Sequence, residues 1–205
     1  MHKKSHYYII MGATLLLFIF SFSQTTLAET AVSKSAETAV SKSEEIPNQY
    51  GLGLTGGSTY DPVSDINFLQ INAFALFDYD KIWPHAAPEP LRFKVECNLG
   101  ATTSSPHRAI ASGNVLALYY LDYFSSHSLR PYMEAGIGVI YTDFQVKGQG
   151  LRVNFNPQLG IGTEIYIDSK PAFYIALRAH HLSNAEIDDD NRGVNSVTLT
   201  VGRFF

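Results

Sequence analysis

The sequence predicts an all-β fold, an eight-stranded antiparallel transmembrane β-barrel, from three observations. Segments of about nine to fifteen residues alternate apolar and polar side chains, with the period of two that a β-strand imposes. The polar face of these segments is poor in charge and rich in Gly, Asn, Gln, Ser and Thr, as a narrow hydrated lumen requires. The chain ends in Val-Gly-Arg-Phe-Phe, and a final strand that closes on a terminal Phe resembles the assembly signal of outer-membrane proteins.

Composition excludes several other classes of protein. The chain has 205 residues, of which 17% are charged, against about a quarter in a soluble domain. Its net charge of −4 comes with no basic cluster, so nucleic acid is not expected as a partner. The single cysteine, Cys97, excludes an intrachain disulfide framework and a multi-cysteine metal site. No apolar run reaches the ~18 residues of a membrane-spanning helix, which excludes a helical multi-span protein.

Residues 1–28 have the features of a secretory signal peptide. Lys3 and Lys4 make the start basic, residues 9–22 are apolar, and Thr26-Leu27-Ala28 places small residues at the −3 and −1 positions of a cleavage site. An uncleaved anchor helix is the alternative, but about 14 residues at about 1.5 Å each fall short of a ~30 Å hydrocarbon core. Together with the barrel pattern, export predicts the outer membrane of a Gram-negative bacterium as the location.

Residues 29–46 are expected to form a disordered linker. The octapeptide Ala-Glu-Thr-Ala-Val-Ser-Lys-Ser occupies residues 28–35 and recurs without change at residues 36–43. Two short polar repeats cannot bury a hydrophobic core, so this tandem repeat predicts no folded unit. The barrel domain then covers residues 47–205.

Eight strands are expected in the barrel domain. The alternation is clearest in residues 151–165, where Leu151 and Val153 face one way and Arg152 and Asn154 face the other. In chain order, the expected strands cover residues 50–57, 66–78, 91–99, 109–122, 133–141, 151–165, 172–183 and 195–201.

A soluble barrel or sandwich would show the same period of two, but with its charged face outside. Aromatic residues gather near the expected strand ends, which is typical of the interfacial girdles of a membrane barrel, and Trp83 is expected to anchor at the membrane interface. With the N-terminus in the periplasm, the connections 80–90, 125–130 and 168–171 are periplasmic. The loops near 58–64, 101–107, 143–150 and 184–194 are then extracellular. The clustered aromatics are Tyr119, Tyr120, Tyr123, Phe124, Tyr132, Phe204 and Phe205.

Three polar residues lie on the otherwise apolar, lipid-facing side of the last two strands. His181 and Ser183 are two residues apart, so their Cα atoms lie about 6.8 Å apart and their side chains share one face. Such a pair can act as base and nucleophile. Asn195 opens the last strand on the same face, across the hairpin, whereas Arg178 and His180 face the lumen. Polar residues at a strand end also mark a membrane interface, which is the alternative interpretation.

The residues around this pair carry a family resemblance. Arg-Ala-His-His-Leu-Ser-Asn-Ala at 178–185, followed by Asn-Arg-Gly-Val-Asn-Ser at 191–196, resembles the lipid A 3-O-deacylases of the PagL family, with their H-x-S-N motif and downstream N-x-G. The resemblance implies an outer-membrane barrel that hydrolyses the ester-linked 3-O-acyl chain of lipid A in lipopolysaccharide. It assigns Ser183 as nucleophile, His181 as base and Asn184 to the oxyanion site. It implies no metal and no cofactor.

Two positions depart from the family pattern. A glutamate expected twelve residues after the serine is Asn195 here, so either this amide or a carboxylate of the following loop orients the imidazole. The glycine often found two residues after the motif asparagine is Glu186, which puts a backbone donor of the oxyanion site in question. The candidate loop carboxylates are Glu186, Asp188, Asp189 and Asp190.

Two other functions compete with the esterase. A non-catalytic small barrel of the adhesin or structural type would carry its function on long extracellular loops, whereas the longest loop expected here has about eleven residues. A barrel acyltransferase or phospholipase would carry different motifs. A homodimer is an association that the sequence leaves open.

Overall fold

The computed structural model describes residues 48–63, 65–79 and 87–205. The expected signal peptide, 1–28, the expected linker, 29–46, and Trp83 lie outside the described residues. None of the described residues belongs to a helix long and apolar enough to cross a membrane.

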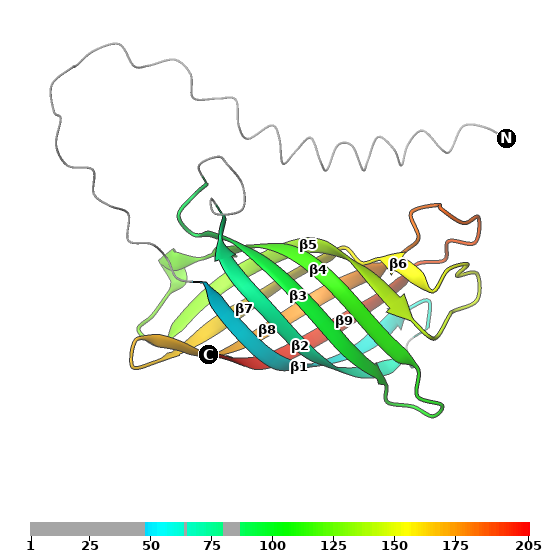
Figure 1. Ribbon diagram of the computed structural model, residues 1–205, viewed down its shortest axis with the longest axis horizontal. Coiled ribbons are helices and arrows are strands. Elements are labelled where there is room, and N and C mark those ends of the chain that lie inside the picture. The colour runs from blue at the N-terminus through cyan, green and yellow to red at the C-terminus, as the bar shows by residue number, and fades with distance from the viewer. Residues whose placement is uncertain (1–47, 64, 80–86) are drawn as a thin grey trace, which may run out of the picture. The chain divides into compact units, whose positions relative to one another are not determined.

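Nine strand segments and one 3-10 helix make up the described chain (Figure 1). Each strand pairs antiparallel with its neighbours, and the pairing of the first strand with the last, together with that of β4 with β5, closes the sheet into a barrel. The elements are β1 Gln49–Asp61, β2 Asn67–Asp78, β3 Leu91–Thr102, β4 Ala109–Tyr120, η2 Asp122–Phe124, β5 Leu129–Thr142, β6 Val153–Phe155, β7 Gln158–Ile167, β8 Lys170–Leu182 and β9 Val194–Phe204.

The barrel has eight strands because β6 and β7 lie end to end in one position. Both pair with β5 in a single register, and the backbones of Gly138 and Asn156 exchange hydrogen bonds of 3.2 and 2.9 Å between the two segments. Pro157 has no N–H to donate to the ladder, which interrupts the strand there. The prediction of eight antiparallel strands is confirmed, while the continuous strand expected over 151–165 is divided.

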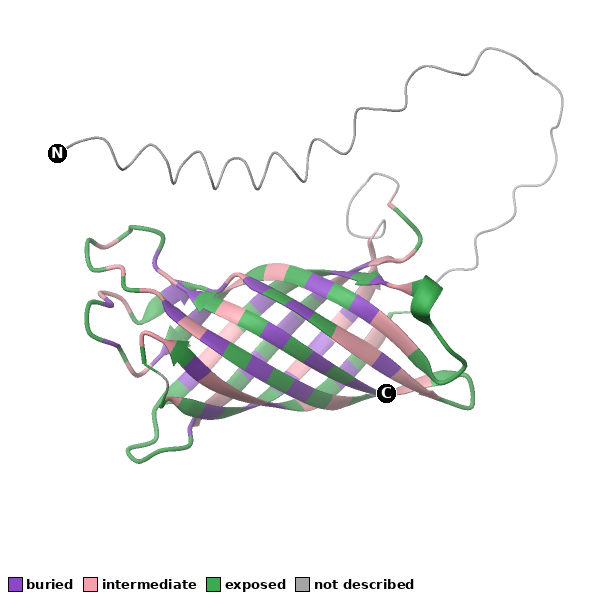
Figure 2. Ribbon diagram, turned by 180° about the vertical axis from the view of Figure 1, so that it is seen from behind, coloured by how far each residue is buried: buried purple, intermediate pink, exposed green. Residues whose placement is uncertain are grey.

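The period of two separates the two faces of the barrel along most of the wall (Figure 2). On β8, Tyr174, Ala176 and Arg178 are buried, whereas Phe173 and Leu177 are exposed. Aliphatic side chains dominate the same outer face on the neighbouring strands, as a lipid-facing surface requires. The fold is therefore that of a transmembrane barrel with an apolar outer wall.

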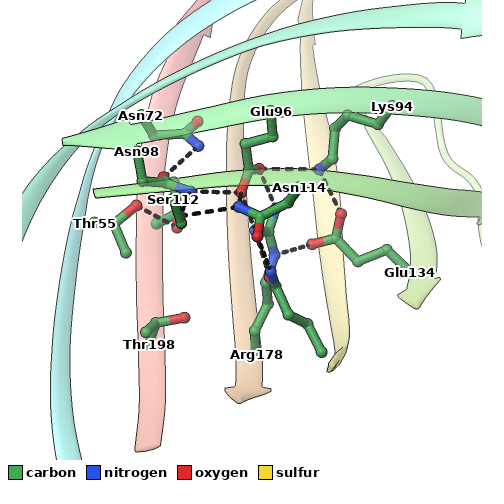
Figure 3. Close-up of polar contacts among 12 residues, drawn as sticks. Thr55, Asn72, Lys94, Glu96, Asn98, Ser112, Asn114, Glu134, Arg178 and Thr198 are labelled. Atoms are coloured by element: carbon green, nitrogen blue, oxygen red, sulfur yellow. Dashed lines mark hydrogen bonds and ion pairs between the residues drawn. The ribbon is translucent and has the colours of Figure 1, made fainter. Parts of the chain in front are cut away.

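Four charged residues of the lumen pair with one another (Figure 3). Arg178 binds both carboxylate oxygens of Glu96, at 2.7 and 2.8 Å, and one oxygen of Glu134 at 2.6 Å. Lys94 donates to Glu134 from the other side. All four side chains are at most 3% exposed. This network joins β3, β5 and β8 across the lumen, so it fixes the strand that leads to the candidate site.

The candidate residues lie at one end of the barrel, here called the loop end. It is formed by the β1–β2, β3–β4, β5–β6 and β8–β9 connections, and the end of β9 lies at the opposite end (Figure 1). At that opposite end the rings of Phe74, Tyr174 and Phe204 pack together, with centroids 5.1 to 5.6 Å apart, and Phe74 meets the other two rings edge-on. The terminal strand is thereby held to β2 and β8 from inside the lumen.

Candidate active site

His181, Ser183 and Asn195 meet on the outer wall at the loop end. His181 is exposed, Ser183 and Asn195 are half-buried, and His181 lies directly opposite Asn195 in the β8–β9 register. Arg178 is buried in the lumen and His180 contacts Thr198 there, through a 3.1 Å hydrogen bond between Nε2 and Oγ1. The neighbouring histidines therefore occupy opposite faces of the wall, as the strand period requires.

A hydrogen bond connects the imidazole of His181 to the Asn195 amide. The distance from Nδ1 of His181 to Oδ1 of Asn195 is 2.6 Å. An amide oxygen can only accept, so Nδ1 carries the hydrogen and Nε2 is left with its lone pair. The ring is thus in the tautomer that allows Nε2 to accept a proton.

Asp61 of β1 extends this chain of contacts. Nδ2 of Asn195 donates to Oδ2 of Asp61 at 3.0 Å, and Arg192 donates to the other oxygen, Oδ1, at 3.1 Å. Asp61 is 134 residues from Asn195 in sequence, and the β1–β9 pairing brings them together. No pattern in the sequence had indicated this residue.

The absence of a side chain at Gly193 makes room for the imidazole of His181. A Cβ atom at this position would come within 2.6 Å of Cε1 and 3.2 Å of Nε2 of His181. Any larger side chain would therefore push against the ring edge that carries the free nitrogen. This contact gives a physical reason for the glycine of the N-x-G segment.

The backbone fixes Ser183 at the end of β8. Its N–H donates to the carbonyl of Phe155 at 3.1 Å, and its carbonyl accepts from the Phe155 N–H at 2.8 Å. Within the described chain, Ser183 Oγ and His181 are not hydrogen-bonded to each other. Bonds between nucleophile and base often tighten only when substrate binds, so this arrangement is compatible with a catalytic pair.

A tight turn follows the serine. The Ile187 N–H donates to the Asn184 carbonyl at 3.2 Å, and the two central residues, Ala185 and Glu186, have φ angles of 53° and 64°. Positive φ at both central positions defines a type I′ turn, which favours glycine. Glu186 therefore adopts backbone geometry that glycine would adopt more easily, at the position where the family resemblance expects glycine.

Asn184 ties this turn to the rest of the loop. Its side chain is buried, its N–H donates to Oδ1 of Asn191 at 2.8 Å, and its Nδ2 donates to the Asp190 carbonyl at 3.1 Å. Its Oδ1 is buried and has no hydrogen-bond partner in the described chain. These contacts give Asn184 a supporting role in the loop, and its part in an oxyanion site stays a prediction.

The loop carboxylates lie apart from the imidazole. Glu186 and Asp189 are exposed, and Asp188 accepts from the Asp190 N–H at 2.9 Å. None of the four acids in the described β8–β9 loop is hydrogen-bonded to His181. The carboxylate that reaches the imidazole, through Asn195, is that of Asp61.

Comparisons with known proteins identify relatives of this chain. The family model described as lipid A 3-O-deacylase (PagL) matches residues 74–203, which is more than half of the chain. A crystal structure of the outer membrane enzyme PagL is similar at 23% identity and a TM-score of 0.55, covering 74% of this chain and 97% of that one. No curated protein sequence matches significantly.

A second solved barrel has a comparable fold. The crystal structure of Neisserial surface protein A (NspA) gives 14% identity and a TM-score of 0.52, covering 77% of this chain and 95% of that one. At such identities the two structural likenesses establish the eight-stranded outer-membrane barrel fold alone. The family match carries the information about activity.

Proposed function

The chain belongs to the lipid A 3-O-deacylase (PagL) family and is an outer-membrane β-barrel hydrolase, and we propose that it uses Ser183 as nucleophile and His181 as general base. The bond cleaved is the ester between a 3-hydroxy fatty acid and the 3-oxygen of lipid A. The assignment is carried by the 2.6 Å hydrogen bond between Nδ1 of His181 and Oδ1 of Asn195, on the same outer wall as Ser183. The surface around His181 and Ser183 faces the outer membrane, where lipid A resides.

The reaction proceeds in two halves. Ser183 Oγ attacks the ester carbonyl while Nε2 of His181 takes its proton, and the tetrahedral intermediate collapses as the imidazolium protonates the departing sugar 3-oxygen. Water then attacks the acyl-enzyme, again losing a proton to Nε2. Collapse of the second intermediate returns the proton to Ser183 and releases the 3-hydroxy fatty acid. The oxyanion is stabilised by donors of the Asn184 loop.

The position of the site suits a lipid substrate. On the same wall, farther from the loop end than His181, the described surface has a shallow apolar depression. It is lined by Leu159, Leu177, Ala179 and Val197. An acyl chain lying along the barrel can occupy it while its ester group reaches the loop end. Lipid A therefore arrives by lateral diffusion in the outer leaflet, without entering the lumen, which the charged network crosses.

Mass spectrometry of lipid A tests the function directly. Purified folded protein incubated with lipid A in mixed micelles should produce a species that lacks one 3-hydroxyacyl group, together with the free 3-hydroxy fatty acid. Protein unfolded by heat serves as the control. Unchanged lipid A, or loss of an acyl chain from another position, would contradict the proposal.

Asn195→Ala should lower the rate of deacylation by about 10² or more, the range typical of a positioned general base. The variant loses the acceptor that holds Nδ1–H, so the imidazole loses its fixed tautomer and direction. Initial rates from the lipid A assay measure the effect, and Glu186→Ala is the control because Glu186 is not hydrogen-bonded to the ring in the described chain. If Glu186→Ala lost most of its activity while Asn195→Ala kept the wild-type rate, the acid that orients the imidazole would instead belong to the loop.

Gly193→Val should also lower the rate by about 10², because a displacement of about 1 Å in a reacting group can cost that much. The new side chain would collide with Cε1 and Nε2 of His181. Gly56→Val is a matched control, since nothing lies within 4 Å of a Cβ at Gly56. Both variants should retain the heat-modifiable mobility of a folded barrel in gels. Full activity of Gly193→Val would mean that the ring does not need its observed position.

A further inference from the structure

We infer that Asp61 is a positioning residue of this site and completes a relay that runs from His181 through Asn195 to Asp61. The inference rests on the proposed function and adds a residue from the opposite end of the chain. Two contacts carry it, His181 Nδ1 to Asn195 Oδ1 at 2.6 Å and Asn195 Nδ2 to Asp61 Oδ2 at 3.0 Å. Both are within ordinary hydrogen-bond distance.

A bulge in β1 aims Asp61 at the relay. Thr59 pairs with Ser196, but the next pair joins Asp61 to Asn195, so Tyr60 is an extra residue in the ladder. Thr59 is buried on the lumen side, and an unbroken period of two would direct Asp61 into the lumen as well. The extra residue shifts Asp61 to the outer face, opposite Asn195. Bulges that redirect a side chain are frequent beside active sites.

The carboxylate of Asp61 decides which way the Asn195 amide lies. A carboxylate only accepts hydrogen bonds, so the amide must present Nδ2 to Asp61 and Oδ1 to His181. The amide oxygen in turn requires hydrogen on Nδ1 and leaves Nε2 free. Without Asp61 the amide could rotate and donate to Nδ1, which would place the hydrogen on Nε2 and remove the base.

Asp61 also supplies the negative charge that an amide lacks. When Nε2 takes the serine proton, the imidazole becomes a cation, and an anion close behind it favours that state. Arg192 binds the other carboxylate oxygen at 3.1 Å. Both side chains are about half exposed, and in the described chain no other charged side chain is bonded to Asp61.

Three single variants separate the relay from a local salt bridge. Asp61→Asn should lower kcat about 10-fold or more with little change in KM, because the residue acts through the base and touches no substrate. Asp65→Asn, in the same β1–β2 connection, is the matched control and should equal the wild type. Arg192→Gln keeps Asp61 and its bond to Asn195, so it should retain most of the activity.

Rescue by a second carboxylate gives a readout that loss of a purely structural contact would not move. In Asp61→Asn the imidazolium that forms when Nε2 takes the serine proton has lost its neighbouring anion. A carboxylate at position 195 restores an anion beside the ring, so Asp61→Asn combined with Asn195→Glu should have a higher kcat than Asp61→Asn alone. Asp61→Ser, measured in the same way, provides the test if the Asn variant fails to give a folded barrel.

The outcomes distinguish this inference from the proposed function. If Ser183→Ala is inactive while Asp61→Asn keeps the wild-type kcat, the relay is overturned and the nucleophile stands. Equal losses in Asp61→Asn and Arg192→Gln, without rescue by Asn195→Glu, would also overturn it, because Asp61 would then serve only to anchor the loop. An active Ser183→Ala would instead refute the proposed function.

Discussion

Replacing Ser183 or His181 by alanine is expected to abolish deacylation, with a fall in kcat of about 10⁴ or more, the scale seen when a nucleophile or its base is removed. Ser183→Ala leaves no atom to form the acyl-enzyme, and His181→Ala leaves no group to take the serine proton. Mass spectrometry of lipid A should show the intact molecule after prolonged incubation with either variant. The two losses should not add in the double variant, because the residues act as one unit.

His180→Ala is the matched control for this experiment. It removes an imidazole one residue away that faces the lumen and contacts Thr198 at 3.1 Å. Its rate should stay close to that of the wild type, while all variants show the heat-modifiable mobility of a folded barrel. Normal activity in Ser183→Ala or His181→Ala, or an inactive but folded His180→Ala, would show that the wrong face of β8 had been assigned to catalysis.

Arg178→Ala is expected to lower the free energy of unfolding by about 3–5 kcal/mol, the cost of breaking a buried ion pair by removing one partner. Glu96 and Glu134 would lose three hydrogen bonds, of 2.6, 2.7 and 2.8 Å, and would stay in the lumen with Lys94 as the cation that contacts both. Urea unfolding in detergent, followed through the gel mobility of the folded form, measures the change.

A compensating variant tests the cause of that loss. Arg178→Ala combined with Glu96→Gln removes one of the two buried charges that Arg178 neutralises, so it should recover part of the lost stability. Arg203→Ala serves as the control, because Arg203 lies on β9 with its side chain exposed. An Arg178→Ala barrel as stable as the wild type would mean that the network does not hold the strands.

Much of the fold could be predicted because the membrane imposes a simple rule on each strand. Leu177 and Leu199 had to face lipid, and Arg178 had to face the lumen, so the period of two placed both walls correctly. The same rule brought His181 and Asn195 to one surface. The interruption at Pro157 was missed because side-chain alternation continues through it, whereas the missing N–H acts on the backbone alone.

Asp61 could not be predicted for the opposite reason. The bulge at Tyr60 breaks the period of two, and nothing in a single strand's pattern reveals an unpaired residue in its ladder. The contact also depends on β1 meeting β9, a pairing between segments more than 130 residues apart. The sequence therefore offered only local candidates for the missing acid, Glu186 and its neighbours in the adjacent loop.

The pairing of β1 with β9 determines when the site is completed during assembly of the barrel. Asp61 belongs to the first strand and Asn195 to the last, so the relay is assembled only when the two edges of the sheet join. A chain in transit, with its edges still apart, has Ser183 and His181 but not the anion behind them. We therefore expect full activity only from a barrel whose first and last strands have paired. In a circular permutant with new termini between β4 and β5, β9 and β1 would be adjacent in sequence. This variant should acquire activity earlier during assembly.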